Sequence, residues 1–166
     1  MKIYVDFDGV IIDSEKMLFE EFAKYHANDE TKKMQFIKGY DWNYLLSNSE
    51  IINDSIYVLK ELPHQNISIL TKVCSMDNEG IAKIKLLRKH GLMNEVILTP
   101  FQMKKSDIVN PTGNMLIDDT VHNLDDWQEK EGIPIFFNKD DRDVDGWNNI
   151  NKVYKKIRKL DEILKK

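Results

Sequence analysis

The sequence predicts an α/β fold, in which helices cover both faces of a parallel β-sheet of about five strands. Residues 3 to 7 form an apolar run with one acid near its end, which is typical of a central parallel strand buried on both faces. Strand-like and helix-like segments then alternate along the chain, and this alternation favours right-handed crossovers between parallel strands. A length of 166 residues suits one domain with a full core.

The composition argues against several classes of protein. The formal net charge of −4 and the pI near 5.6 argue against a general nucleic-acid binder, whose surface would be basic. A single cysteine, Cys74, excludes an internal disulfide framework and a cysteine zinc cluster, and we interpret it as a small buried thiol. Asp6 interrupts the first apolar run early, so we expect no signal peptide, no membrane contact and a soluble cytoplasmic protein.

Helical periodicity begins directly after the first strand. Apolar residues recur at helical spacing from Ser14, which is the expected N-cap. Residues 28–48 are polar with scattered aromatic residues, and they indicate short helices and loops outside the sheet. We therefore predict a small helical cap insert over about 14–48. A further helix is predicted between Ser49 and Pro63.

The rest of the chain alternates between strands and helices. The predicted strands are residues 67–71, 95–99, 115–117 and 133–137. Helices are predicted from Asp77 to Gly91, where the glycine supplies a left-handed cap, and from Val121 to Gly132, where the glycine is the expected terminator.

The C-terminal segment carries apolar residues at helical spacing, at Ile150, Val153, Ile157, Leu160 and Leu164. Residues 152–166 hold seven Lys and Arg against two acids. We predict a basic amphipathic helix over about 147–165 that packs its apolar stripe on the single domain 1–166. A contact with nucleic acid or a membrane surface is the alternative use of its basic face.

Polar side chains follow the predicted strands at the carboxyl ends, where open parallel sheets bind ligands. They are Asp6 and Asp8 after the first strand, Thr71 at the end of the second, Lys104 and Lys105 in the loop after the third, and Asp118 and Asp119 after the fourth. Parallel neighbouring strands would bring Thr71 near Asp6. Several carboxylates around one point suit Mg²⁺, whereas a threonine hydroxyl and a lysine suit a phosphate beside it. A carboxylate can attack phosphorus, and a second acid two residues on can protonate the leaving oxygen.

Four motifs carry a resemblance to a known family. D-F-D-G-V at 6–10, L-T at 70–71, Lys105 in a loop before a strand, and L-I-D-D at 116–119 resemble, in order and spacing, the motifs of the haloacid dehalogenase (HAD) superfamily of phosphohydrolases. The resemblance spans residues 1 to about 138 and implies a Rossmann-like sheet with a cap inserted after the first motif.

Other proteins with a D-x-D motif fit less well. A calcium loop would need a third ligand and a closing glutamate at loop spacing, and position 17 is a methionine. A metal-dependent glycosyltransferase would leave Thr71, Lys105 and the late acid pair unexplained. A response-regulator receiver carries its adjacent acids on the first strand, whereas here the adjacent pair comes late.

The HAD resemblance implies a role for each acid. Asp6 would be the nucleophile that forms an aspartyl-phosphate, and Asp8 would act as general acid and then as general base. Mg²⁺ would be bound by the Asp6 carboxylate, the Asp8 backbone carbonyl and the late acid pair. Asp119 is expected as a direct ligand, and Asp118 either binds the ion or supports the site from behind.

The resemblance also implies a phosphate site. Thr71 would bind the phosphoryl oxygens, and a lysine would neutralise them together with the nucleophile. Lys104 and Lys105 cannot be separated by spacing alone, although the sequence K-S-D-I favours Lys105. The expected partner is therefore a small phosphomonoester, and we expect no nucleic-acid partner.

The sequence resembles two branches of the superfamily, which act on different substrates. L-I-D-D-T, N-L-x-x-W and G-I-P-I-F-F-N resemble the 5′(3′)-deoxyribonucleotidase-like branch, which acts on nucleoside monophosphates. Aromatic residues of the cap would then either stack on the base or pack only the cap's own core, and they are Phe36, Tyr40, Trp42 and Tyr44. D-F-D-G-V-I-I-D-S-E also resembles the phosphatases and phosphomutases of sugar phosphates or phosphoglycolate. A non-catalytic binding protein on a HAD scaffold is a third alternative, and the complete motif set argues against it.

Overall fold

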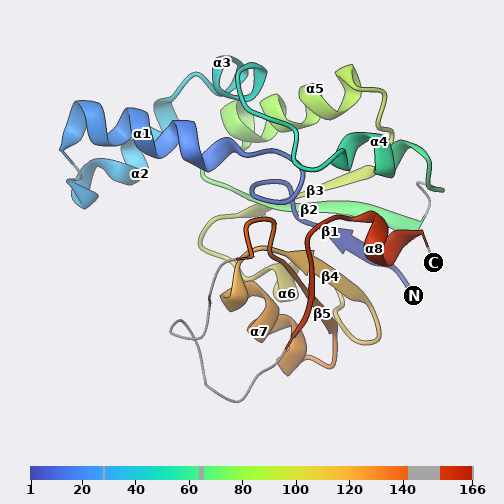
Figure 1. Ribbon diagram of the computed structural model, residues 1–166. Coiled ribbons are helices and arrows are strands. Elements are labelled where there is room, and N and C mark those ends of the chain that lie inside the picture. Colours follow the sequence, from blue (N-terminus) through green and yellow to red (C-terminus); the bar gives the residue numbers. More distant parts are fainter. Residues whose placement is uncertain (28, 64–65, 142–153, 166) are drawn as a thin grey trace.

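A parallel six-stranded sheet forms the centre of the protein, which confirms the predicted α/β class. The computed structural model describes residues 1–27, 29–63, 66–141 and 154–165 (Figure 1). In spatial order the strands are β3-β2-β1-β4-β5-β6. Their bounds are β1 Ile3–Val5, β2 Ile67–Val73, β3 Glu95–Pro100, β4 Met115–Asp118, β5 Ile133–Phe137 and β6 Lys155–Ile157.

The register of the three central strands aligns their carboxyl ends. Val5 of β1 lies opposite Ile69 of β2 and Ile117 of β4. The ladder continues one residue further, where the Asp6 backbone N–H donates to the Ile117 carbonyl at 2.9 Å. Asp6 therefore leaves the sheet beside Asp118, the last residue of β4.

Helices of 4 to 13 residues lie between these strands, except that α8 follows the last strand. They are α1 Ser14–His26, α2 Glu30–Gly39, α3 Trp42–Ser47, α4 Ser55–Lys60, the π-helical turn η2 Met76–Gly80, α5 Ile81–Lys89, α6 Lys105–Ile108, α7 Val121–Glu129 and α8 Asp161–Leu164. In Figure 1, α4 and α5 lie on one side of the sheet, and α6 and α7 lie on the other. Within the described residues, we find no helix with the length and apolar character that crossing a bilayer requires.

Side-chain alternation along the strands produces two apolar cores. Val5, Ile69 and Ile117 are fully buried in the larger core, which includes Leu59 of α4 and Leu87 of α5. The residues beside them in sequence, among them Tyr4, Leu70 and Leu116, pack instead with Trp127 of α7. The sheet is therefore covered on both faces, as the unbroken apolar pattern of its strands requires.

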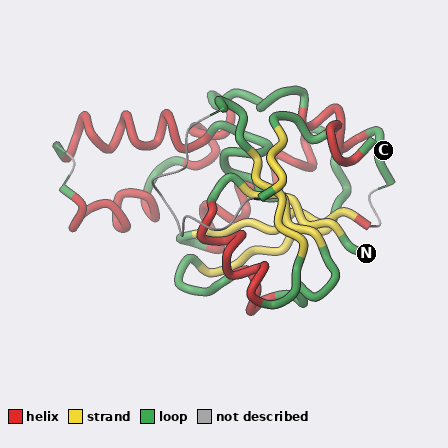
Figure 2. Tube along the Cα trace, turned by 60° about the horizontal axis from the view of Figure 1, so that its bottom comes forward, coloured by secondary structure: helices red, strands yellow, loops and turns green. Residues whose placement is uncertain are grey.

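The predicted cap region consists of α1, α2 and α3. Both views show α1 and α2 side by side, extending away from the sheet (Figures 1 and 2). The helix predicted from Ser49 begins six residues later, at Ser55. Ile51 forms a β-bridge with Ile12, and Asp54 adopts a left-handed conformation with φ 58°, so the intervening segment cannot be helical.

The predicted C-terminal helix over 147–165 is wrong for most of the part that the structure describes. Residues Lys155–Ile157 form the edge strand β6, parallel to β5, and only Asp161–Leu164 are helical. Ile157 pairs with Phe137, and both Ile157 and Leu160 are buried in the core. These two residues of the predicted helical stripe therefore lie in a strand and in the turn after it. Residues 147–153 of the predicted helix lie outside the described part of the chain.

Candidate active site

Three carboxylates meet at the carboxyl edge of the sheet. Asp6 follows β1, Asp118 ends β4 and Asp119 comes directly after it. Each offers an oxygen that lies within 4.8 Å of the others. Hard carboxylate oxygens at this spacing are the ligand type that Mg²⁺ prefers, so the donor set fits a divalent cation.

Gly9 allows the loop after Asp8 to approach this cluster. Its φ is 75°, and a Cβ at this position would lie 2.0 Å from Oδ2 of Asp119. Any side chain would therefore displace Asp119, in addition to the strain of a left-handed backbone.

We expect Gly9→Ala to lose about 10²-fold in activity, because it pushes Asp119 out of the carboxylate cluster. Gly113→Ala is the matched control, since Gly113 has φ 69° and no atom within 4 Å of its added Cβ. Both variants should lose about 1–2 kcal/mol of unfolding free energy from the left-handed backbone. Only Gly9→Ala should lose activity in a phosphatase assay, and equal activity in the two variants would contradict this role of Gly9.

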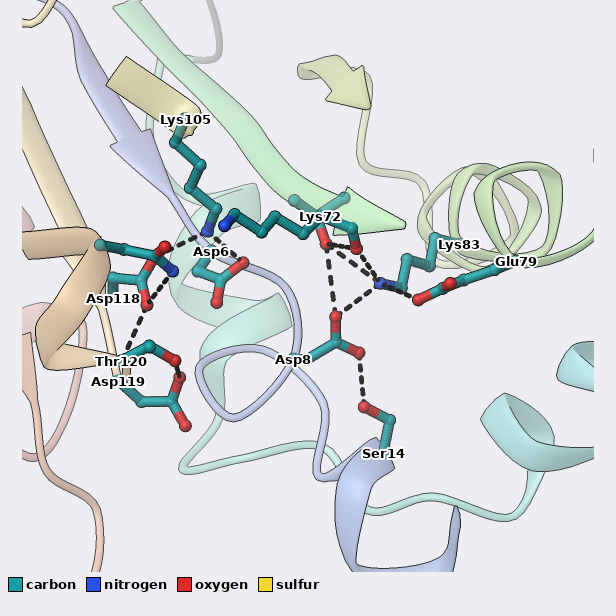
Figure 3. Close-up of polar contacts among 12 residues, drawn as sticks. Asp6, Asp8, Ser14, Lys72, Glu79, Lys83, Lys105, Asp118, Asp119 and Thr120 are labelled. Carbon is teal, nitrogen blue, oxygen red and sulfur yellow. Dashed lines mark hydrogen bonds and ion pairs between the residues drawn. The ribbon is translucent and has the colours of Figure 1, made fainter. Parts of the chain in front are cut away.

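Lys105 is the cation at the centre of the carboxylates. Its buried amine lies 2.7 Å from Oδ1 of Asp6 and 2.6 Å from Oδ2 of Asp118 (Figure 3). Burial disfavours the charged amine, but the two carboxylates outweigh burial and raise the pKa of Lys105. Lys104, the other candidate, pairs with Asp126 at 2.6 Å, and its side chain is half exposed. The structure thus brings Lys105, and not Lys104, to the three acids.

The acids are crowded even with Lys105 between them. Burial and the neighbouring Asp118 raise the pKa of Asp6 to about 7. Burial and the charges of Asp118 and Asp6 also raise the pKa of Asp119 well above its ordinary value. Added positive charge at this point would relieve the repulsion, which is a further reason why the cluster fits a divalent cation.

Asp118 and Asp119 differ in the hydrogen bonds that their carboxylate oxygens already accept. Asp118 accepts from Lys105, from the Thr120 backbone N–H at 2.8 Å and from the Asn123 amide at 3.1 Å. Asp119 accepts a longer bond, at 3.3 Å, from the Thr120 hydroxyl. Asp119 is therefore better placed to offer oxygen to an ion, and Asp118 to hold Lys105.

Asp8 lies apart from this cluster and is held by other partners. The Ser14 hydroxyl donates to its Oδ1 at 2.5 Å, and the Thr71 hydroxyl donates to its Oδ2 at 3.3 Å. The side chain of Thr71 is fully buried at this contact with Asp8. Asp13, at the N-cap position of α1, makes no capping bond and pairs with Lys139.

Lys83 and Glu79, which were not predicted as site residues, form a buried ion pair beside Asp8. The Lys83 amine lies 2.5 Å from Oδ2 of Asp8 and 2.9 Å from Oε1 of Glu79. Glu79 and Lys83 are four residues apart, a spacing that usually marks a solvated helix face. The pattern alone therefore gave no signal that this pair is buried.

A cavity of about 630 Å³ opens over the site. Asp6, Asp8 and Asp119 line it, together with Lys72, which extends toward Lys105 in Figure 3. Lys72 thus brings a second amine to this cavity, and burial and the nearby charge of Lys105 lower its pKa. On the cap side the lining residues include Phe19, Lys33, Met34 and Ile37.

The four cap aromatics differ in their relation to the cavity. Trp42 is buried and lines it. Phe36 packs within 5.4 Å of the Phe22 ring and 5.2 Å of the Tyr40 ring, in a small core of the cap. Tyr44 is 54% exposed and is not among the residues that line the cavity. Of the four, Trp42 alone is placed to touch a ligand.

Cys74 also lines the cavity, half-buried beside the Glu79 ion pair. Burial, together with the charge of Glu79, raises the pKa of its thiol to about 11. A thiol that stays protonated at neutral pH is a poor nucleophile. Cys74 is only half-buried, however, and not the fully buried thiol that was predicted.

Comparisons with known proteins give the same fold. No protein-family model and no curated protein match the sequence. Among solved structures, a HAD phosphatase from Thermococcus onnurineus matches with a TM-score of 0.65 and 17% identity, over 99% of this chain and 97% of its own. The chain has the HAD fold. A HAD hydrolase from Entamoeba histolytica follows with a TM-score of 0.63 and 13% identity, over 98% and 94% of the two chains.

A third HAD structure is described with a metal. The HAD hydrolase YfnB from Bacillus subtilis, described as bound to magnesium, matches with a TM-score of 0.61 and 16% identity over 97% of this chain and 95% of its own. At these identities the likeness establishes the HAD fold, which agrees with the four sequence motifs. The function of this chain has to be argued from its own residues.

Proposed function

We propose that this protein is a Mg²⁺-dependent phosphomonoesterase that works through an aspartyl-phosphate on Asp6. The observation that carries the proposal is the group of Asp6, Asp118 and Asp119 around buried Lys105, at the floor of a cavity of about 630 Å³. A fourth carboxylate, Asp8, also lines that cavity. Nucleophile, proton donor and cation are then available to one phosphate group.

In the first half-reaction an oxygen of the Asp6 carboxylate attacks phosphorus, and the bond from phosphorus to the leaving oxygen breaks. Asp8, in its protonated form, gives its proton to that oxygen, so that an alcohol leaves. In the second half-reaction Asp8 takes a proton from water, which attacks the phosphorus and frees phosphate and the Asp6 carboxylate.

The other residues balance charge around this transfer. Lys105 lies between Asp6 and Asp118 and offsets the negative charge of nucleophile and phosphoryl group, and Lys72 offers a second cation from the cavity wall. Asp6, Asp119 and the Asp8 carbonyl are the proposed ligands of Mg²⁺, with Asp118 behind them. The bound ion supplies positive charge against the phosphoryl oxygens.

For the substrate we propose a nucleoside monophosphate, as the resemblance to the deoxyribonucleotidase-like branch suggests. Trp42 and Phe19 offer apolar surface on the cap side of the cavity. The alternative is a sugar phosphate, and one observation favours it. Glu30 and Lys33 of α2 line the same cavity, and their charged groups suit hydroxyls better than a base.

A substrate panel separates these possibilities. We expect phosphate release in Mg²⁺ from p-nitrophenyl phosphate and from ribo- and deoxyribonucleoside monophosphates, with higher kcat/KM for nucleotides than for hexose phosphates or phosphoglycolate. Higher kcat/KM for sugar phosphates would overturn the nucleotide assignment. No release from any member of the panel would overturn the phosphatase proposal itself and favour a binding protein on a HAD scaffold.

A further inference from the structure

Lys83 of α5 is a buried cation that none of the four sequence motifs contains. Its side chain is 0% exposed, and its amine lies within reach of four oxygens (Figure 3). They are Oδ2 of Asp8 at 2.5 Å, Oε1 of Glu79 at 2.9 Å, the Lys72 carbonyl at 3.0 Å and the Thr71 hydroxyl at 3.1 Å. An ammonium group has three donors, so this environment satisfies it fully without water.

Two aromatic rings also lie near the Lys83 amine. The ring centroid of Phe7 lies 5.3 Å from Nζ, and that of Trp42 lies 5.5 Å from it. Both rings are buried, and Trp42 belongs to the cap helix α3. Burying a lysine here is costly unless its charge is matched, and the carboxylates of Asp8 and Glu79 both match it. Burial lowers the pKa of Lys83, but the charges of Asp8 and Glu79 outweigh burial and raise it.

The contact with Lys83 also fixes the position of the Asp8 carboxyl group. Oδ2 is held by Lys83, and Oδ1 is held by the Ser14 hydroxyl at 2.5 Å. The Asp8 side chain keeps 20% exposure and lines the cavity. Its carboxyl group is thus clamped at both oxygens from behind, while one side stays open to a ligand.

We propose that Lys83 is a positioning residue, which holds the Asp8 carboxyl group where it can transfer a proton to the leaving oxygen. The inference rests on the proposed phosphatase function. Glu79 holds Lys83 in turn, and it accepts the Cys74 backbone N–H at 2.6 Å, which ties the pair to the end of β2. Without the amine, Asp8 keeps only the Ser14 hydroxyl and the longer bond from the Thr71 hydroxyl, so its carboxyl group is held less firmly toward the leaving oxygen. Departure of the unprotonated oxygen then becomes slow.

The test compares two leaving groups in one variant. The p-nitrophenolate ion leaves readily without a proton, whereas an alkyl oxygen needs one, so only alkyl phosphates depend strongly on Asp8. We measure kcat/KM in Mg²⁺ for p-nitrophenyl phosphate and a simple alkyl phosphate, because kcat/KM reports the steps up to departure of the leaving group. Lys83→Met should lower the alkyl value about 10²-fold, and the loss for p-nitrophenyl phosphate should be at least about tenfold smaller.

Asp8→Asn should show the same split, and combining it with Lys83→Met should add little, because both changes remove the same proton transfer. If Lys83→Met does not fold, Lys83→Met with Glu79→Met removes both charges of the buried pair and keeps similar volumes, which buried pairs commonly tolerate. The double variant should show the split as well.

Equal losses on both substrates in the folded variant would overturn the inference and leave Lys83 with a structural role. That outcome would leave the proposed function intact, because the wild-type protein would still release phosphate. A wild-type protein that cleaves neither ester would refute the phosphatase proposal instead.

Discussion

Replacing Asp6 with asparagine is expected to lower phosphate release by about 10⁴-fold or more, because an amide cannot attack phosphorus as a carboxylate does. The fold should survive, since asparagine has nearly the same shape and Lys105 keeps Asp118 at 2.6 Å. Release of phosphate from p-nitrophenyl phosphate in Mg²⁺ measures the loss, and a thermal melt checks the fold.

Asp13→Asn is the matched control for this change. Asp13 belongs to the same N-terminal stretch, but it pairs with Lys139 and is not among the residues that line the cavity. Its replacement should leave kcat/KM within about twofold of wild type, as expected away from the reacting groups. If Asp6→Asn were about as active as the control, the assignment of Asp6 as the nucleophile would be wrong.

The second large effect is expected from Lys105→Met. Asp6 and Asp118 would lose their common partner, and breaking a buried ion pair in this way typically costs about 3–5 kcal/mol of unfolding free energy. Loss of the positive charge beside the phosphoryl group should also lower kcat/KM about 10³-fold. Denaturant unfolding and steady-state kinetics measure the two effects separately.

Lys104→Met provides the comparison within the same loop. Lys104 forms its ion pair with Asp126 from a half-exposed position, where solvent screens the charge of the amine. We expect little change in stability and a kcat/KM within about twofold of wild type. A larger loss of activity in Lys104→Met than in Lys105→Met would contradict the assignment of Lys105.

Much of the fold follows from hydrophobic periodicity. Central strands that are buried on both faces are continuous apolar runs, so β2 and β5 were predicted close to their observed bounds. The edge strand β6 was missed because it is three residues long and its Ile157 also fits a helical stripe with Leu160 and Leu164. Only pairing with β5 distinguishes a strand from a helix at this position, and such pairing depends on tertiary structure and not on the local sequence.

The site was predictable where residues follow strand ends. Asp6, Asp118 and Asp119 meet because parallel strands align their carboxyl ends, a consequence of topology alone. The choice between Lys104 and Lys105 depends on which side chain turns inward at the start of α6, and spacing does not determine that. Lys83 comes from the middle of the connection between β2 and β3, where an acid and a lysine four residues apart give no hint of burial.

Chemical trapping of the covalent intermediate tests the central claim most directly. The protein is mixed with a phosphomonoester and Mg²⁺, quenched within one turnover and reduced with borohydride, which converts an aspartyl-phosphate to homoserine. Peptide mass spectrometry then locates the modified residue. We predict homoserine at position 6, and none in Asp6→Asn. Turnover with an unmodified Asp6, or with homoserine at another aspartate, would contradict the account.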